Sequence, residues 1–164
     1  MNWRPMRAAD LAALSAAAAA IHPGYPESDA VFAERLTLAP EGCHVLDDGG
    51  ALAGYALTHP WRYGEPPKLD TLLGAIPADA DTWYLHDVAL LPHARGRGAS
   101  AAIVGIVAAL AAERGLASLS LVAVNHSRPI WEARGFAVAA DAAPDLSSYG
   151  GVAWFMARRT GDTF

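Results

Sequence analysis

The sequence predicts an α/β fold with a mixed sheet. The apolar runs Cys43–Leu46 and Ala51–Thr58 flank the sequence Asp-Asp-Gly-Gly, which accommodates the positive φ angles of a tight hairpin turn and predicts an antiparallel pair. Between Thr82 and Val124, a strand pattern, a helical pattern and a second strand pattern follow one another. This order predicts a crossover connection between two parallel strands.

The amino-terminal part of the chain is expected to hold one strand and two helices. Residues Asn2–Met6 are a candidate first strand, after which Asp10 is suited to cap a helix over Leu11–Ile21. A second helix is expected to begin near Ser28 or Asp29 and to stop at Pro40. Helices therefore precede the predicted hairpin.

The remaining elements follow the hairpin in order. Residues His59–Asp81 are rich in proline and glycine, which indicates an ordered excursion over the surface. Thr82–Leu91 is the longest strand candidate, and a helix over about Gly98–Arg114 presents one apolar face. Leu119–Val124 is almost wholly apolar, as expected of a strand covered on both faces. The last predicted elements are a short helix over Ser127–Arg134, a strand beginning at Phe136 and a strand near Val152–Arg158.

Length and composition favour one domain spanning residues 1–164 and exclude several classes of partner. The formal charge is −5, Lys68 is the only lysine and no basic run occurs, so the electrostatic footprint of a nucleic-acid binder is missing. Because Cys43 is the only cysteine, neither an intrachain disulfide nor a cysteine-rich zinc site can form, and no metal is implied.

The single cysteine and the amino-terminal residues favour a cytoplasmic protein. Leu11–Ile21 is apolar and follows Arg4 and Arg7, as in a secretory leader, but Asp10 stands where such a leader would turn apolar. The run is also shorter than the roughly 20 residues of a membrane span, so no membrane partner is expected.

The loop Arg95-Gly96-Arg97-Gly98-Ala99-Ser100 lies between the long strand candidate and its helix. Glycines and small residues let a ligand approach the backbone, and the first amides of a helix lack internal partners. The helix dipole and two arginines then favour a phosphate or pyrophosphate. A plain turn between strand and helix is the alternative. The loop matches neither the dinucleotide fingerprint nor the Gly-Lys-Ser/Thr phosphate loop.

These residues resemble the GNAT superfamily of acyl-CoA-dependent N-acyltransferases. Leu90-Leu91-Pro92 followed by Arg95–Ser100 is similar to the family's Arg-x-x-Gly-x-Gly/Ala loop. Asn125-His126-Ser127, Trp131-Glu132 and Gly135-Phe136 resemble the family's asparagine-to-aromatic helix, and Arg4–Asp10 resembles its opening strand and helix entry. Ser100 departs from the usual Gly or Ala.

The resemblance implies a mixed, mostly antiparallel central sheet with a splayed parallel strand pair, flanked by helices, and acetyl-CoA bound in the V between the splayed strands. It implies contacts to the coenzyme from three parts of the chain. These are the backbone of Val88, Ala89 and Leu90, the loop residues Arg95, Gly96, Arg97, Gly98, Ala99, Ser100 and Ala101, and the later residues Asn125 and Trp131. Members often form dimers, so a homodimer is left open.

Acetylation of an amine needs a proton acceptor and a group that assists the departing thiolate. Trp131 stands where relatives carry a tyrosine, and an indole has no titratable proton to give. The sulfur is therefore expected to leave as a thiolate, helped either by helix amides or by a different hydroxyl, for which Ser127 and Tyr149 are the candidates. His86 or Asp87 is the candidate base, with only one expected to face the cleft because adjacent strand residues alternate faces. A buried, hydrogen-bonded pair without a catalytic role is the alternative.

On the acceptor side, Tyr25, Trp61 and Tyr84 are expected to form an aromatic wall, and Glu27, Asp87 or Asp145 could attract a cationic amine. The predicted function is direct transfer of the acetyl group of acetyl-CoA to an amine of a small molecule or amino-acid-like substrate. Two alternatives stay open: a non-catalytic acyl-CoA-binding or sensing module, and a protein N-terminal or lysine acetyltransferase.

Overall fold

The computed structural model describes residues 1–163, which form seven strands and four α-helices. Short 3-10 turns lie before α1, β2, α3 and β7. The elements run β1 (Asn2–Pro5), α1 (Leu11–Ile21), α2 (Asp29–Leu38), β2 (Cys43–Asp48), β3 (Ala51–Trp61), β4 (Thr82–Leu90), α3 (Ala99–Glu113), β5 (Ser118–Val124), α4 (Arg128–Glu132), β6 (Ala137–Val138) and β7 (Ala153–Arg159).

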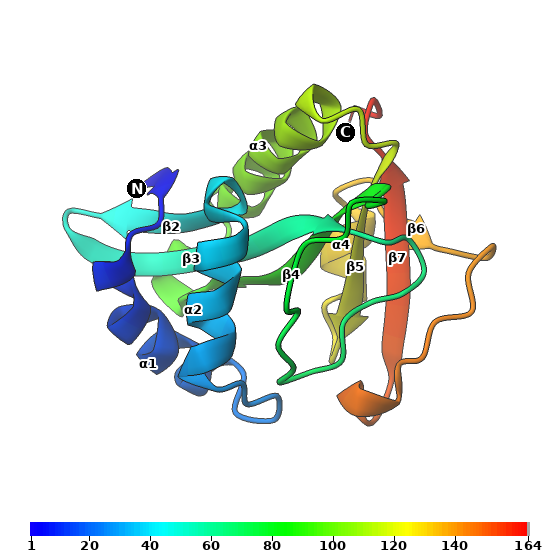
Figure 1. The fold of residues 1–164 in the computed structure, drawn as a ribbon. Helices are drawn as coiled ribbons and strands as arrows, with labels where there is room; N and C mark the ends of the chain where they lie inside the picture. Colours follow the sequence, from blue (N-terminus) through cyan, green and yellow to red (C-terminus); the bar gives the residue numbers. More distant parts are fainter. Residues whose placement is uncertain (164) are drawn as a thin grey trace.

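The strands form one sheet in the order β1-β2-β3-β4-β5-β7-β6 (Figure 1). Among the strands of residues 1–163, only the β4–β5 pair is parallel, and every other neighbouring pair is antiparallel. The predicted mixed, mostly antiparallel α/β fold is therefore confirmed. The β2–β3 hairpin turns through Gly49 and Gly50, whose φ angles of 65° and 96° suit residues without a Cβ.

β3 extends three residues beyond the predicted end, through Pro60 to Trp61. Proline lacks the N–H that a central strand would donate. β2 pairs with β3 only as far as Leu57, so one edge of β3 is free of a partner strand at Pro60.

Asp10 immediately precedes α1, as expected, but it does not cap that helix. Its carboxylate accepts hydrogen bonds from the Arg7 amide at 2.8 Å and from the Arg4 guanidinium at 2.8 and 2.9 Å. A 3-10 turn over Ala8–Asp10 takes the place of the expected direct entry into the helix.

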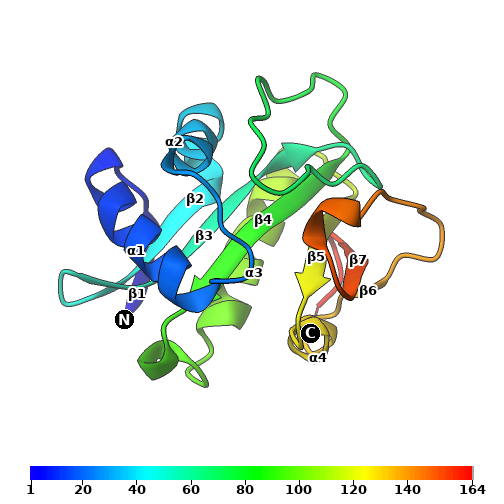
Figure 2. The same cartoon turned by 90° about the horizontal axis from the view of Figure 1, so that it is seen from below.

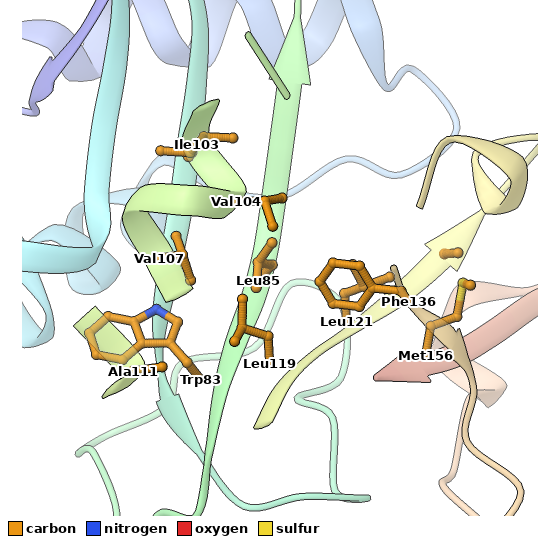
Figure 3. Packing of buried hydrophobic residues seen from close by; sticks show 12 residues of the cluster. Trp83, Leu85, Ile103, Val104, Val107, Ala111, Leu119, Leu121, Phe136 and Met156 are labelled. Carbon is orange, nitrogen blue, oxygen red and sulfur yellow. The ribbon is translucent and has the colours of Figure 1, made fainter. Parts of the chain in front are cut away.

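Helices cover both faces of the sheet (Figure 2). α1 and α2 pack on one face against a cluster that includes Val45, Tyr55 and Leu57. α3 packs on the other face, where Ile103, Val104 and Val107 lie over β4 and β5 (Figure 3). Each of these buried aliphatic side chains contributes about 1.5–3 kcal/mol by leaving water. The central part of the sheet is thus packed between helices on both faces.

β4 and β5 share only part of their length. Their register runs from Thr82↔Ser118 to Leu85↔Leu121, although β4 continues to Leu90 and β5 to Val124. Figure 2 shows the two strands diverging toward their carboxyl ends. Because β5 stays paired with β7 throughout and β4 with β3, the sheet opens as two halves. The splayed parallel pair implied by the resemblance is confirmed.

Candidate active site

A cleft of about 620 Å³ lies where β4 and β5 have separated. Its walls come from the end of α1 with the segment before α2, residues 85–90 of β4, the loop that opens α3, and β5 with the segment that follows it. Leu69 of the excursion after β3 and Tyr149 before β7 complete them. Of the predicted site residues, those that line it are Tyr25, Glu27, His86, Asp87, Val88, Ala89, Leu90, Arg95, Gly96, Ser100, Asn125, Ser127, Trp131 and Tyr149.

The loop before α3 presents unused backbone donors. Gly96 and Gly98 have φ angles of 72° and 78°, and α3 has no side-chain cap. The Arg95 amide donates to the Pro92 carbonyl, and the first helical bond runs from the Ala102 amide to the Gly98 carbonyl. Within residues 1–163, the amides of residues 96 to 101 have no protein acceptor. Such amides at a helix start bind phosphate groups.

The remaining loop residues divide between two sides. Arg97, Gly98 and Ala99 line a second, smaller hollow of about 360 Å³ beside β1, where Trp3 Nε1 donates to the Ala99 carbonyl at 2.9 Å. Ala101 lines neither hollow. Of the predicted loop cations, only Arg95 lines the cleft, with its Nε donating to the Leu90 carbonyl at 3.1 Å.

Arg134 is a second cation of the cleft that sequence reasoning missed. It follows α4, and its Nε and Nη2 donate to Ser100 Oγ at 3.2 and 3.1 Å. This contact links the end of the α4 segment to the first turn of α3. The sequence shows the Gly135-Phe136 motif beside it, but nothing in the sequence marks the preceding arginine, because its partner Ser100 is brought to it only by the fold.

The free edge of β4 faces the cleft. The Leu91 amide donates to the Ala53 carbonyl of β3 at 2.9 Å, so alternation turns the peptide groups of Val88 and Leu90 toward the opposite edge. The peptide groups of Ala89 turn to β3 instead. An extended ligand lying in the cleft can therefore bond to Val88 and Leu90 as an added strand would.

The expectation that only one of His86 and Asp87 faces the cleft is wrong, because both line it. The cause is a β-bulge. Leu57 of β3 pairs with Asp87 and the next residue, Thr58, pairs with Leu85, which leaves His86 as the extra residue. A bulge interrupts the alternation of faces, so two adjacent side chains can share one face.

His86 is tied to Glu27, a residue predicted only as an attractor of amines. The imidazole Nε2 lies 2.8 Å from Glu27 Oε1, and the two side chains are 1% and 6% exposed. Glu27 Oε2 also accepts the Asp70 amide at 3.0 Å. Burial opposes ionisation of Glu27, but the bonds from His86 and Asp70 outweigh it and lower the pKa of this carboxyl.

Asp87 links a tyrosine to a second histidine. Its Oδ2 accepts the Tyr55 hydroxyl at 2.6 Å, and its Oδ1 lies 3.2 Å from Nε2 of His22. The Asp87 carboxylate raises the pKa of His22 against the opposing effect of burial. His22 comes from the end of α1, so residues far apart in the chain form this group.

The predicted acids are held by carbonyl groups. Ser127 Oγ donates to the Val124 carbonyl at 2.7 Å, and the Tyr149 hydroxyl donates to the Pro67 carbonyl at 3.1 Å. Burial raises the pKa of Tyr149. Trp131 packs against Phe136 and borders the cleft.

The predicted aromatic wall is only partly present. Tyr25 lines the cleft and donates its hydroxyl to Asn125 Oδ1 at 3.3 Å. Trp61 and Tyr84 do not line it, because β4 is still paired on both edges at their end of the sheet. The buried Tyr84 hydroxyl lies 3.3 Å from that of Tyr149. Asp145 lies outside the cleft near Lys68.

The excursion after β3 is fastened beside the part of the cleft that holds Glu27 and His86, because the Asp70 amide donates to Glu27. The Leu69 amide donates to Ser148 Oγ at 3.0 Å, and the amides of Leu73 and Gly74 donate to Glu34 at 2.6 and 2.9 Å. Leu69 itself lines the cleft. These bonds give the segment a defined place although it contains no helix or strand.

Within residues 1–163, no three His, Cys, Asp or Glu side chains are arranged to hold a metal ion. None of the helices in that range combines the length and apolar character needed to cross a bilayer.

With this geometry established, comparison with known proteins identifies the family. The sequence matches the Acetyltransferase (GNAT) family over residues 10–136, most of the chain, and the protein belongs to that family. The resemblance seen in the loop and in the asparagine-to-aromatic block is therefore confirmed. The family supports an acyl-CoA-dependent acyltransferase in general terms. No curated protein matches the sequence.

Solved structures share the fold at low identity. The GphF GNAT-like decarboxylase in complex with isobutyryl-CoA is 19% identical with a TM-score of 0.76, over 98% of this chain and 100% of that one. The loading GNATL domain of CurA from Lyngbya majuscula is 11% identical with a TM-score of 0.77, over 97% of each chain. The ribosomal-protein-S18-alanine N-acetyltransferase from Escherichia coli is 20% identical with a TM-score of 0.66, over 99% of this chain and 96% of that one.

Proposed function

We propose that this chain is a cytoplasmic N-acetyltransferase that moves the acetyl group of acetyl-CoA directly to an amine of a small molecule or amino-acid-like substrate. The cleft between β4 and β5 carries the proposal, because it joins unused amides at one end to two carboxylate–imidazole pairs at the other. A diphosphate is suited to the first end and proton removal from an amine to the second.

The residues present fit a coenzyme A thioester. Residues 96 to 101 offer free amides for its diphosphate, with Arg95 and Arg134 as nearby cations. The free peptide groups of Val88 and the Leu90 amide would pair with the amide groups of its pantetheine arm, since the Leu90 carbonyl already accepts from Arg95 Nε. Asn125, Ser127 and Trp131 would border the same arm from the β5 side.

The fastening of residues 67–74 supports a small acceptor. Leu69 and Tyr149 border the end of the cleft that holds His86 and Asp87, and hydrogen bonds fix both residues. A protein amino terminus or lysine would need a wider approach to the same groups. Tyr25 would supply the aromatic surface beside the acceptor.

The departing sulfur would leave as a thiolate. Trp131 offers only an indole N–H, and the Ser127 and Tyr149 protons are engaged with carbonyl oxygens. Either hydroxyl would have to rotate before it could protonate sulfur. Trp131 is also the observation that favours the second candidate function, a non-catalytic module that binds acyl-CoA.

Release of coenzyme A thiol separates these functions. We expect acetyl-CoA to bind in calorimetry and its thiol to be released steadily when small primary amines are supplied. A protein that binds the thioester but releases thiol only at the rate of buffer is the sensing module. Acetylation of peptide termini or lysines with no turnover of small amines would contradict the small-acceptor proposal.

A further inference from the structure

The pair formed by Asp87 and His22 has the geometry of a proton acceptor with its positioning group. We propose that His22, positioned by Asp87, accepts the proton from the amine during acetyl transfer. The inference rests on the proposed function and assigns a role that sequence reasoning gave to His86 or Asp87.

The orientation of His22 decides which nitrogen can act. Nε2 is enclosed and lies 3.2 Å from Asp87 Oδ1, an ion-pair contact whose angle falls outside hydrogen-bond geometry, while the side chain as a whole is 25% exposed. The exposed part of the ring is therefore on the side away from Nε2, and His22 lines the cleft. A carboxylate beside Nε2 favours the neutral tautomer with its proton there. Nδ1 then holds the lone pair on the accessible side.

His86 is less suited to the role. Its side chain is 1% exposed and lies against Glu27, whose Oε1 is 2.8 Å from its Nε2. Its Nδ1 is buried and has no hydrogen-bond partner within residues 1–163. An amine in the cleft cannot reach that buried nitrogen, whereas it can reach the ring of His22.

Asp87 is better suited to orient than to accept. Its Oδ2 is occupied by the Tyr55 hydroxyl at 2.6 Å and its Oδ1 faces His22. A hydroxyl donating to a carboxylate stabilises the anion and makes it a weaker base. The same bond fixes the carboxylate, so Tyr55, Asp87 and His22 form a chain directed toward the cleft.

The transfer step balances through this chain. The neutral amine nitrogen forms a bond to the acetyl carbonyl carbon, whose π electron pair moves to oxygen. The proton on that nitrogen passes to Nδ1 of His22, and Asp87 stabilises the resulting imidazolium. When the carbonyl re-forms, the carbon–sulfur bond breaks and its electron pair leaves as thiolate. The imidazolium then releases its proton to water, and the thiolate takes one up from water.

Three charged groups from separate segments act on His22. Asp87 on β4 and Glu27 before α2 favour its cationic form, and Arg95 in the loop after β4 opposes it. Because Asp87 is the largest of these influences, replacing it with a neutral residue should lower the pKa of His22. The acid limb of the rate profile should then move to lower pH.

The test compares His22→Gln with His93→Gln in the full-length chain. His93 also has an aspartate near its Nε2, with Asp48 at 3.7 Å, but it lies outside the cleft. We expect His22→Gln to lower kcat by about 10²- to 10⁴-fold, as loss of a general base does, while the Kd for acetyl-CoA stays within about twofold. His93→Gln should behave as the wild type.

Asp87→Asn supplies a readout that does not depend on the fold of the first variant. With one acceptor amine used throughout, its acid limb of kcat/KM should lie at lower pH than that of the wild type. An unchanged kcat in His22→Gln overturns the inference, and so does an acid limb that stays in place in Asp87→Asn. A wild-type protein that turns over no amine contradicts the proposed function instead.

Discussion

The glycines of α3 allow one substitution to be tested at two positions with opposite expected signs. Gly98 precedes the helix with a φ of 78°, whereas Gly105 lies inside it with an ordinary helical φ. A Cβ added at either position meets no atom within 4 Å. Steric clash is therefore absent from both sites, and backbone conformation alone separates them.

The magnitudes follow from that difference. Alanine in the left-handed region costs about 1–2 kcal/mol, so Gly98→Ala should destabilise the fold by that amount. Alanine in a helix interior is favoured over glycine by about 0.5–1 kcal/mol, so Gly105→Ala should stabilise it. For a chain of this size, each kcal/mol moves Tm by about 2–4 °C.

Urea denaturation and acetyl-CoA calorimetry on both variants provide the assay. Gly98→Ala should also weaken acetyl-CoA binding, because it disturbs the loop that presents the free amides, while Gly105→Ala should leave the Kd unchanged. Equal and same-signed stability changes in the two variants would refute the conformational reasoning. An unaltered Kd in a destabilised Gly98→Ala variant would show that this glycine does not contribute to acetyl-CoA binding.

Three further predictions concern other groups. Arg134→Ala should weaken acetyl-CoA binding about tenfold, because it removes a cation proposed to lie beside the diphosphate. Arg128 lies outside the cleft, so Arg128→Ala should leave the affinity unchanged. Equal losses of affinity in calorimetry would contradict this prediction. Burial lowers the pKa of His59 to about 3 from an ordinary value near 6.5, so the unfolded chain takes up the proton first as pH falls. Stability at pH 5 should therefore drop by about 2 kcal/mol relative to pH 7.5, and His59→Phe should remove this part of the acid slope in urea titrations; parallel slopes would show that His59 is not responsible. Burial raises the pKa of the Cys43 thiol to about 12, so a thiol reagent at pH 8 should label it only after unfolding, and rapid labelling of the native protein would disprove its enclosure.

Most of the fold followed from local patterns in the sequence. The Asp-Asp-Gly-Gly turn fixed the β2–β3 hairpin, and the strand–helix–strand order fixed the parallel pair. The splay of that pair came only from the family resemblance. The residues of β4 do not indicate where its pairing with β5 ends, because the end of the pairing depends on how the two halves of the sheet pack.

The site was predicted less completely, for physical reasons that individual residues show. The bulge at His86 depends on the residue count of β3 relative to β4, which a strand pattern does not reveal. The sequence predicts Trp61 in the acceptor wall, yet in β3 it pairs with Thr82, at the end of β4 that is still bonded to β5. Arg134 and His22 acquire their roles through Ser100 and Asp87, partners distant in sequence.

Amide resonances of residues 96 to 101, followed by ¹⁵N NMR during titration, test the central claim most directly. Coenzyme A should shift these resonances together with those of Val88 and Leu90. Pantetheine, which lacks the diphosphate, should shift only the β4 residues. Loop amides that stay unmoved by coenzyme A, while the ligand binds elsewhere, would contradict the account.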